Sequence, residues 1–323
     1  MNNSPIISNC TVKAIRDAAL ALKDGHLVAF PTETVYGLGA DARNPEAVKR
    51  IYEAKGRPTD HPLIVHISSL TQLDKWAIDI PEYAIKLARK FWPGPMTLIL
   101  NRSEIAADFI TGGQNTVGLR VPNHPIALEL VKHFEEITNS AIAAPSANRF
   151  GQVSPTSGAD VFEELGEYLS EFDLILEGGN SSIGIESTIV DCTSERPIIL
   201  RNGAVTKEDI EIELGIVGVE RSTYNKIKFS GSFEKHYAPK CEIIITPVII
   251  EKAGFLALYE VETPPGMKRL ASPKTVEEFA RILYATFRVA DEIGVLTLVV
   301  SQPHGGGLST AIRERLEKAA GGR

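Results

Sequence analysis

The chain has 323 residues, of which 43% are hydrophobic, 23% charged and 7% aromatic, a composition typical of a globular protein with a packed core. This composition excludes a disordered, collagen-like or coiled-coil chain. Because a single core grows inefficiently beyond ~250–300 residues, the length favours two domains. The 41 acidic residues outnumber the 34 Lys and Arg, giving a net charge of -7, so a polyanion would bind only where positive charge is concentrated in one cleft.

The cysteines and the N-terminal segment favour a cytoplasmic protein. Cys10, Cys192 and Cys241 are odd in number and far apart, so they predict neither a disulfide framework nor a Cys-x-x-Cys metal or redox site. The N-terminal run MNNSPIISNC lacks a signal-peptide pattern, and no stretch approaches the roughly 20 apolar residues of a membrane span. We therefore expect no association with a membrane.

Strand-like and helix-like segments are interspersed over the first two thirds of the chain. The apolar periodicity predicts helices at residues 11–24, 44–54, 81–91, 124–134 and 158–165. It predicts strands at residues 26–30, 62–67, 96–101, 116–122, 141–147, 172–178 and 187–192. So many strands, without strict alternation with helices, favour a mixed α/β sheet over a barrel.

The periodicity fails between residues 218 and 240, where Ser, Gly and basic residues are mixed, and it then restarts. Strands are predicted at residues 242–250, 254–260 and 295–300, and helices at 275–293 and 309–320. This pattern predicts a large domain at 1–217, a linker at 218–240 and a small, Rossmann-like α/β domain at 241–323.

The most unusual stretch is FPTETVYGLGADA, residues 30–42, in which a strand leads into hydroxyls, a carboxylate and glycines. Gly37-x-Gly39-x-x-Ala42 resembles a dinucleotide fingerprint, but six residues separate it from the strand that it should follow directly, which disfavours that interpretation. A glycine turn between a strand and a helix would explain the glycines. It would not explain the polar cluster from Thr32 to Thr34.

Four cations stand at the ends of predicted elements. Lys55 and Arg57 lie on one Gly-Pro turn, which suits a polyphosphate, although the helix dipole alone also favours cations there. Arg120, in GLRVP, and Arg201, in LRNGA, stand at the ends of strand-like segments, where open α/β sheets bind their ligands. The sequence therefore predicts a local anion pocket in an acidic protein.

Seven ordered motifs together resemble the YrdC-type threonylcarbamoyl-adenylate synthase family. They are PTETVYGLGADA, KGRP, PGPMTLIL, TVGLRVPNHP, APSAN with SPT, GIESTIVD and LRNGA, and the trailing KHYAP resembles the long, two-domain form. His61 stands where the family usually has Asn, and Asn202 where it usually has Pro. The resemblance implies a twisted open α/β sheet around a positive cavity.

The resemblance also implies an activity: formation of threonylcarbamoyl-AMP and pyrophosphate from L-threonine, bicarbonate or CO2 and ATP, for the modification of certain tRNAs. The implied threonine-binding residues are Thr34, His66, Arg120, Ala144 and Ser187. The implied ATP-binding residues are Lys55, Arg57, His61, Thr116, Ser146, Asn148, Ser154, Arg201 and Tyr237, with Lys55 and Arg57 as catalytic residues. Mg²⁺ is expected with ATP, without identified protein ligands, and the expected partner is a tRNA threonylcarbamoyltransferase, with weak or no direct binding of tRNA.

Two other functions stay open at the level of sequence. A cleft lined by the same cations could bind double-stranded RNA without catalysis, although the net charge opposes this. The chain could also transfer a carbamoyl group from carbamoyl phosphate, as related maturation proteins of this fold do, although those carry additional metal-binding modules.

Overall fold

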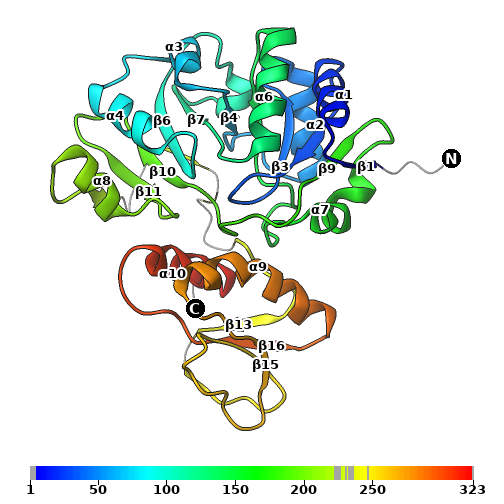
Figure 1. Cartoon of the computed structure of the whole chain (residues 1–323), viewed down its shortest axis with the longest axis vertical. Helices are drawn as coiled ribbons and strands as arrows, with labels where there is room; N and C mark the ends of the chain where they lie inside the picture. Colours follow the sequence, from blue (N-terminus) through cyan, green and yellow to red (C-terminus); the bar gives the residue numbers. More distant parts are fainter. Residues whose placement is uncertain (1–4, 222–226, 230, 232–235, 246, 322–323) are drawn as a thin grey trace.

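The structure is a computed structural model that describes residues 5–221, 227–229, 231, 236–245 and 247–321. It has a large unit, followed along the chain by a smaller one that lies beneath it in Figure 1. None of the helices in the described ranges is long and apolar enough to cross a membrane.

The large unit is built on a mixed sheet. Its strands are β1 (Ile6–Asn9), β2 (Val28–Phe30), β3 (Gly37–Asp41), β4 (Ile64–His66), β5 (Ala77–Ile78), β6 (Met96–Arg102), β7 (Thr116–Arg120), β8 (Ile142–Ala143), β9 (Leu174–Glu177), β10 (Thr188–Asp191), β11 (Ile198–Arg201) and β12 (Glu220–Arg221). Within the described part of the chain their order is β1-β9-β2-β3-β8-β4-β7-β6-β10-β11-β12, with β5 paired to β6.

Helices cover both faces of this sheet. They are α1 (Val12–Lys23), α2 (Pro45–Lys55), α3 (Leu73–Trp76), α4 (Glu82–Phe91), α5 (Asp108–Thr111), α6 (Pro125–Thr138), α7 (Gly158–Leu165) and α8 (Lys207–Leu214). Successive side chains of a strand point to opposite faces, so Val28 and Phe30 pack in one apolar cluster with α1 and α6, whereas Ala29 packs in the other with α2 and α4. The predicted mixed α/β class is confirmed.

The small unit has a parallel sheet of its own, with the order β13-β16-β14-β15 among the described residues. Its elements are β13 (Glu242–Ile244), β14 (Gly254–Leu256), β15 (Lys268–Ala271), α9 (Val276–Glu292), β16 (Thr297–Val300) and α10 (Leu308–Ala319). Figure 1 shows α9 and α10 on the side of this sheet that faces the large unit. Phe279 and Leu283 of α9 share an apolar cluster with Val35 and Ile185 of the large unit, so the core continues from one unit into the other.

The glycines of the YGLGADA motif lie in a strand and not in a turn. Gly37 and Gly39 belong to β3, which pairs antiparallel with β2, so neither the glycine turn nor a dinucleotide loop is present. A Cβ on Gly39 would lie 2.7 Å from Ile142 Cγ2 and 2.9 Å from Phe30 Cε1. Glycine is therefore required by the close approach of side chains from the neighbouring strands β2 and β8.

Several boundaries differ from the sequence prediction. Strand β8 ends at Ala143 and β13 at Ile244, where longer strands were predicted, and the sequence did not predict β1, β3, β5, β11, β15, α3, α5 or α8. Strand β12 extends the large sheet into the predicted linker by pairing with β11. Parts of that linker, residues 222–226, 230 and 232–235, lie outside the described residues.

Candidate active site

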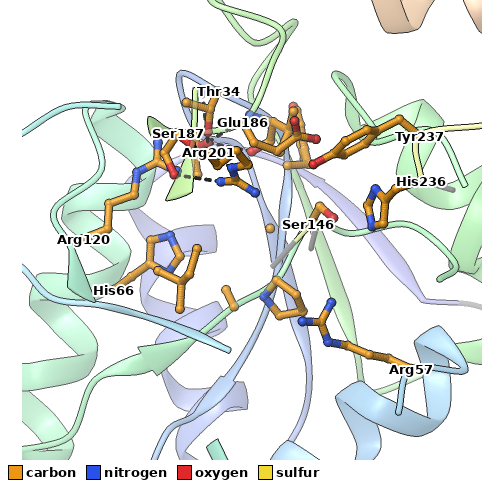
Figure 2. Close-up of a pocket in the computed structure, with 18 residues that line it drawn as sticks. Thr34, Arg57, His66, Arg120, Ser146, Glu186, Ser187, Arg201, His236 and Tyr237 are labelled. Atoms are coloured by element: carbon orange, nitrogen blue, oxygen red, sulfur yellow. Dashed lines mark hydrogen bonds between the residues drawn. The ribbon is translucent and has the colours of Figure 1, made fainter. Parts of the chain in front are cut away.

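A cavity opens where strand ends of the large sheet meet the described part of the linker (Figure 2). Its space not filled by atoms is about 530 Å³, including the part open to solvent. Its lining consists of Thr32, Thr34, Val35, Tyr36, Gly37, Arg57, Ile64, His66, Arg120, Ala144, Pro145, Ser146, Glu186, Ser187, Arg201, Gly231, His236 and Tyr237.

Hydrogen bonds of the polar cluster from Thr32 to Thr34 hold the turn between β2 and β3. Thr32 Oγ1 donates a hydrogen bond to the carbonyl oxygen of Val35 at 2.6 Å and accepts from the backbone N–H groups of Thr34 and Val35. Thr32 and Thr34 hydroxyl oxygens are 2.9 Å apart. These bonds fix the turn, so that the Thr34 side chain stands at the cavity wall.

Arg120 and His66 stand together at one side of the cavity, on neighbouring parallel strands (Figure 2). Arg120 Nη2 donates to Glu33 Oε1 at 2.7 Å, and both side chains are almost fully buried. Burial and the nearby charge of Arg120 lower the pKa of His66 to about 3. A neutral imidazole therefore lies beside a guanidinium that has a buried counter-ion.

Lys55 and Arg57 lie close together on the Gly-Pro turn after α2, but their side chains have different surroundings. Arg57 lines the cavity opposite Arg120 (Figure 2), and its Nη2 donates to the Pro62 carbonyl at 3.0 Å. Lys55 is not among the lining residues; its Nζ donates to the carbonyl oxygens of Ser146, at 2.6 Å, and Asn148. In this conformation Lys55 holds the loop after β8, and Arg57 faces the cavity.

Ser187 and Arg201 form a bonded pair at the ends of neighbouring strands. Arg201 Nε donates to the Ser187 carbonyl at 2.9 Å, and its Nη2 donates to Ser187 Oγ at 3.1 Å. Ser187 Oγ also lies 2.8 Å from Thr97 Oγ1. A buried guanidinium is thus anchored to the backbone at the cavity wall.

Glu186 is a buried carboxylate in the cavity wall, and three donors hold it. Ser154 Oγ donates to its Oε1 at 2.6 Å, the Tyr284 hydroxyl to its Oε2 at 3.0 Å, and Arg315 Nε to its Oε2 at 2.9 Å. Burial alone would raise the pKa of Glu186, but the charges of Arg315 and Arg201 and the bond from Ser154 lower it to about 2. Glu186 is therefore ionised at neutral pH.

Tyr237 closes the cavity on the linker side. Its φ of 61° lies in the left-handed region, which costs a bulky residue of order 1–3 kcal/mol unless the surroundings fix it. The surroundings are the Tyr284 ring, stacked with centroids 5.7 Å apart, and the Arg315 guanidinium, 5.4 Å from the Tyr237 centroid. The small unit thus supplies the surface on which Tyr237 rests.

Most of the residues that the sequence proposed line this one cavity. The lining set is Thr34, Arg57, His66, Arg120, Ala144, Ser146, Ser187, Arg201 and Tyr237. The others are Lys55, His61, Thr116, Asn148 and Ser154, which lie outside the lining. Ser154 contacts the wall through Glu186, and Asn148 Nδ2 donates to the carbonyls of Arg149 and Gln152. The ligand contacts assigned to all these residues stay predictions.

Sequence reasoning did not select Glu186, nor the role of Glu33 as counter-ion to Arg120. The available signal was a carboxylate within two of the polar motifs, PTET and GIEST, of a pocket expected to bind anions. Such a carboxylate needs a cation nearby, because an unpaired buried charge is costly. The partner Arg315, 129 positions away, could not be identified from the motif alone.

The donor set suits anions better than a protein-bound metal. Among the described residues, no group of three or more His, Cys, Asp and Glu side chains could hold a metal ion. Glu186, the carboxylate in the lining, has its oxygens bonded to Ser154, Tyr284 and Arg315. Arginines, hydroxyls and a neutral histidine around one cavity can bind carboxylate and phosphate groups.

Comparisons with known proteins show which family the chain resembles. Residues 20–203 match the family model of the Sua5, YciO and YrdC proteins, described as "Telomere recombination", and residues 205–321 match "Threonylcarbamoyl-AMP synthase, C-terminal domain". A threonylcarbamoyl-AMP synthase of Pyrococcus abyssi is 42% identical, over 96% of this chain and 94% of its own length. One of Bacillus subtilis is 39% identical, over 96% and 93%.

A solved structure extends the likeness to the arrangement of both units. The crystal structure of P. abyssi Sua5 complexed with L-threonine matches with a TM-score of 0.86 and 39% identity, covering 98% of this chain and 97% of that one. The relatives are thus similar in sequence and in structure over almost their whole lengths. On this ground the chain belongs to the threonylcarbamoyl-AMP synthase family, in its two-domain form.

Proposed function

We propose that the chain condenses L-threonine, bicarbonate or CO2 and ATP into threonylcarbamoyl-AMP and pyrophosphate. The observation that carries the proposal is a cavity with buried arginines on opposite sides, Arg120 on one and Arg57 on the other (Figure 2). Such a cavity suits two anionic substrates that must react with each other in the space between the two arginines. Family membership and the threonine complex of the P. abyssi relative support the same reaction.

Threonine is assigned to the side of the cavity that Arg120 and His66 occupy. The Arg120 guanidinium would bind the carboxylate of threonine while it keeps its ion pair with Glu33. His66 is neutral because of its burial and the nearby charge of Arg120. It can therefore accept a hydrogen bond, and it repels the ammonium group of an incoming threonine less than an imidazolium would. Thr34, Ser187 and Ala144 surround this side with small groups.

ATP is assigned to the side that Arg57 occupies, and Arg201, which is bonded to Ser187, would contact the phosphates from the adjoining wall. Burial lowers the pKa of Arg57 to about 10, so Arg57 keeps its charge at neutral pH. Lys55 would act here through the loop that it holds, whose Ser146 lines the cavity. Tyr237 offers an aromatic face close to the nucleotide.

The reaction needs positioning and charge stabilisation more than a protein nucleophile. Bicarbonate supplies CO2 by taking up a proton and losing water. The neutral amine of threonine adds to the carbon of CO2, so that an N–C bond forms, one C–O π bond opens onto oxygen and the amine proton passes to solvent, which gives a carbamate. A carbamate oxygen then forms a bond to the α-phosphorus of ATP while the bond from that phosphorus to the β-phosphate bridging oxygen breaks, releasing pyrophosphate. Arginines that face the reacting groups offset the charge that develops, as in other phosphorus transfers. A cavity covered by Tyr237 would also keep water from the short-lived carbamate.

Mg²⁺ is proposed to enter as part of the substrate, Mg·ATP. The carboxylate in the lining, Glu186, is already bonded to three donors, so the phosphates would be the main ligands. Bound in this way, the ion would neutralise phosphate charge. Because the product would be used on tRNA, we also propose a cytoplasmic site of action and a tRNA threonylcarbamoyltransferase as the downstream partner.

Burial of the arginines disfavours the alternative of double-stranded RNA binding. Arg57, Arg120 and Arg201 are 7%, 5% and 3% exposed. Phosphates of a rigid duplex cannot enter a cavity of this kind, whereas a nucleotide or an amino acid can. The structure thus favours small anionic substrates over a polyanion.

The test is the detection of threonylcarbamoyl-AMP by mass spectrometry after incubation with threonine, bicarbonate and Mg·ATP. Omission of bicarbonate and substitution of carbamoyl phosphate for it are the matched controls. The proposal predicts product with bicarbonate and none with carbamoyl phosphate alone. Product formed only from carbamoyl phosphate would indicate the carbamoyl-transfer alternative, and no nucleotide product with either would contradict both enzymatic functions.

A further inference from the structure

Two helices of the small unit reach the rear of the cavity wall with charged and polar groups. Arg315 of α10 is fully buried and donates to Glu186 Oε2 at 2.9 Å, and Tyr284 of α9 donates to both oxygens of Glu186, at 3.2 and 3.0 Å. Neither Arg315 nor Tyr284 is among the lining residues. Their connection to the cavity runs through Glu186 and Tyr237.

A second contact between the units lies beside the first. The backbone N–H and side-chain Nδ2 of Asn202 donate to Glu314 Oε2 at 3.2 and 3.0 Å. Asn202 directly follows Arg201, a lining residue. Consecutive residues of α10, Glu314 and Arg315, thus bond to two different segments of the cavity wall.

Glu186 places a negative charge where an ATP-binding cavity needs positive potential. At van der Waals distances a pair of unit charges interacts strongly in a partly buried site, so an uncompensated Glu186 would repel phosphate. It would also attract Arg201, whose Nη2 now bonds to Ser187 Oγ. Arg315 counters both effects from behind the wall, and its own charge is secure: burial alone would lower the pKa of Arg315, but Tyr237 and Glu186 raise it above its usual value.

We propose that Arg315 and Tyr284 are positioning residues of the synthase: they fix Glu186, offset its charge on the ATP side of the cavity and support Tyr237. The small unit is therefore a part of the nucleotide site. This inference rests on the proposed function only for the identity of the ligand, since the contacts themselves are in the structure.

The experiment measures ATP and threonine affinity separately, by calorimetry, in the full chain. Arg315→Met removes the charge and keeps most of the side-chain volume. In this variant nothing offsets the charge of Glu186 from behind the cavity wall. We therefore expect ATP binding to weaken by about 10- to 100-fold, the range for a single charge-assisted contact. Threonine affinity is expected to change much less. Arg281→Met is the matched control, because it removes a charge from a half-exposed side chain of α9.

The decisive variant is Arg315→Met combined with Glu186→Gln. Removing the carboxylate charge leaves nothing to compensate, so the double variant should recover most of the ATP affinity that Arg315→Met loses. A purely structural link between the units would instead be weakened further by the second substitution. Recovery supports the proposal; an ATP affinity equal to or below that of Arg315→Met overturns it, as does unchanged ATP affinity in Arg315→Met.

Tyr284→Phe keeps the proposal testable if Arg315→Met does not fold. The substitution removes one donor to Glu186 and keeps the ring that stacks on Tyr237. We expect a loss of ATP affinity of roughly 3- to 10-fold, which corresponds to one net hydrogen bond. A folded Tyr284→Phe with wild-type ATP affinity overturns the proposal. Because ATP binding is measured without threonine or bicarbonate, this outcome is distinct from failure of the wild-type chain to make threonylcarbamoyl-AMP.

Discussion

Replacing Glu33 by Gln is expected to lower the stability of the fold and to raise its affinity for threonine. The pair of Glu33 and Arg120 is joined at 2.7 Å, with side chains 5% and 6% exposed. Leaving one member of a buried pair without its partner costs about 3–5 kcal/mol. Gln can still accept the hydrogen bond but carries no charge, so we expect a smaller loss of unfolding free energy, about 1.5–3 kcal/mol.

The assay is thermal unfolding with and without threonine. For a unit of this size a loss of 1.5–3 kcal/mol corresponds to a fall in Tm of about 3–12 °C. In Glu33→Gln the ligand carboxylate becomes the main counter-ion of Arg120, so threonine should raise Tm by more than it does in the wild type. Arg120→Met should abolish the threonine effect in either background.

The control is Glu195→Gln, which removes a carboxylate from an exposed position. It should leave both Tm and the threonine effect unchanged. If Glu33→Gln has the wild-type Tm and the wild-type response to threonine, then Arg120 is not the carboxylate-binding group that competes with Glu33. The assignment of threonine to this side of the cavity would then be wrong.

Three further outcomes are expected. Arg57→Met should weaken ATP binding in calorimetry by about 10- to 100-fold, the range for one charge-assisted contact, and an unchanged affinity in the folded variant would remove Arg57 from the phosphate site. Because one methyl group is worth only ~1–3 kcal/mol, turnover should favour threonine over serine by ~10- to 200-fold, and equal kcat/KM values would rule out a methyl-sized pocket. The pKa of His66 is lowered from 6.5 to about 3, so its contribution to stability is present above pH 6.5 and is lost as pH falls toward 3. His66→Asn should reduce the slope of unfolding free energy against pH in this window by up to about 1.4 kcal/mol per pH unit, and an identical slope would contradict burial of a neutral imidazole.

The sequence predicted the fold class and the location of the site because both depend on local patterns. Strand and helix periods are visible within a window of a dozen residues, and polar motifs at strand ends mark the ligand-binding edge of an α/β sheet. The motif around Gly37 and Gly39 shows the limit of this reasoning. Whether a glycine serves a turn or a close approach depends on the neighbouring strand, here Ile142 of β8, which is about 100 positions away.

The division of roles between Lys55 and Arg57 shows a second limit. Two cations on one turn look equivalent in the sequence, but the structure directs Lys55 to backbone carbonyls and Arg57 to the cavity. Burial and the nearby charge of Arg57 lower the pKa of Lys55 well below its usual value, which no motif can indicate. The choice between a ligand contact and a structural contact is made by tertiary packing.

The distribution of charge in the cavity explains how an acidic protein can bind small anions selectively. Before substrates arrive, Arg120 is paired with Glu33 and Glu186 with Arg315, so the fold does not carry these buried charges uncompensated. An arriving carboxylate therefore competes with Glu33 for Arg120, and only a group held in the right geometry by the hydroxyls and backbone around it can do so. Large polyanions cannot bind these arginines, because their phosphates cannot enter the cavity. The net charge of -7 also repels polyanions from the protein surface. Selectivity against RNA and affinity for ATP thus have one physical origin, the burial of the cations.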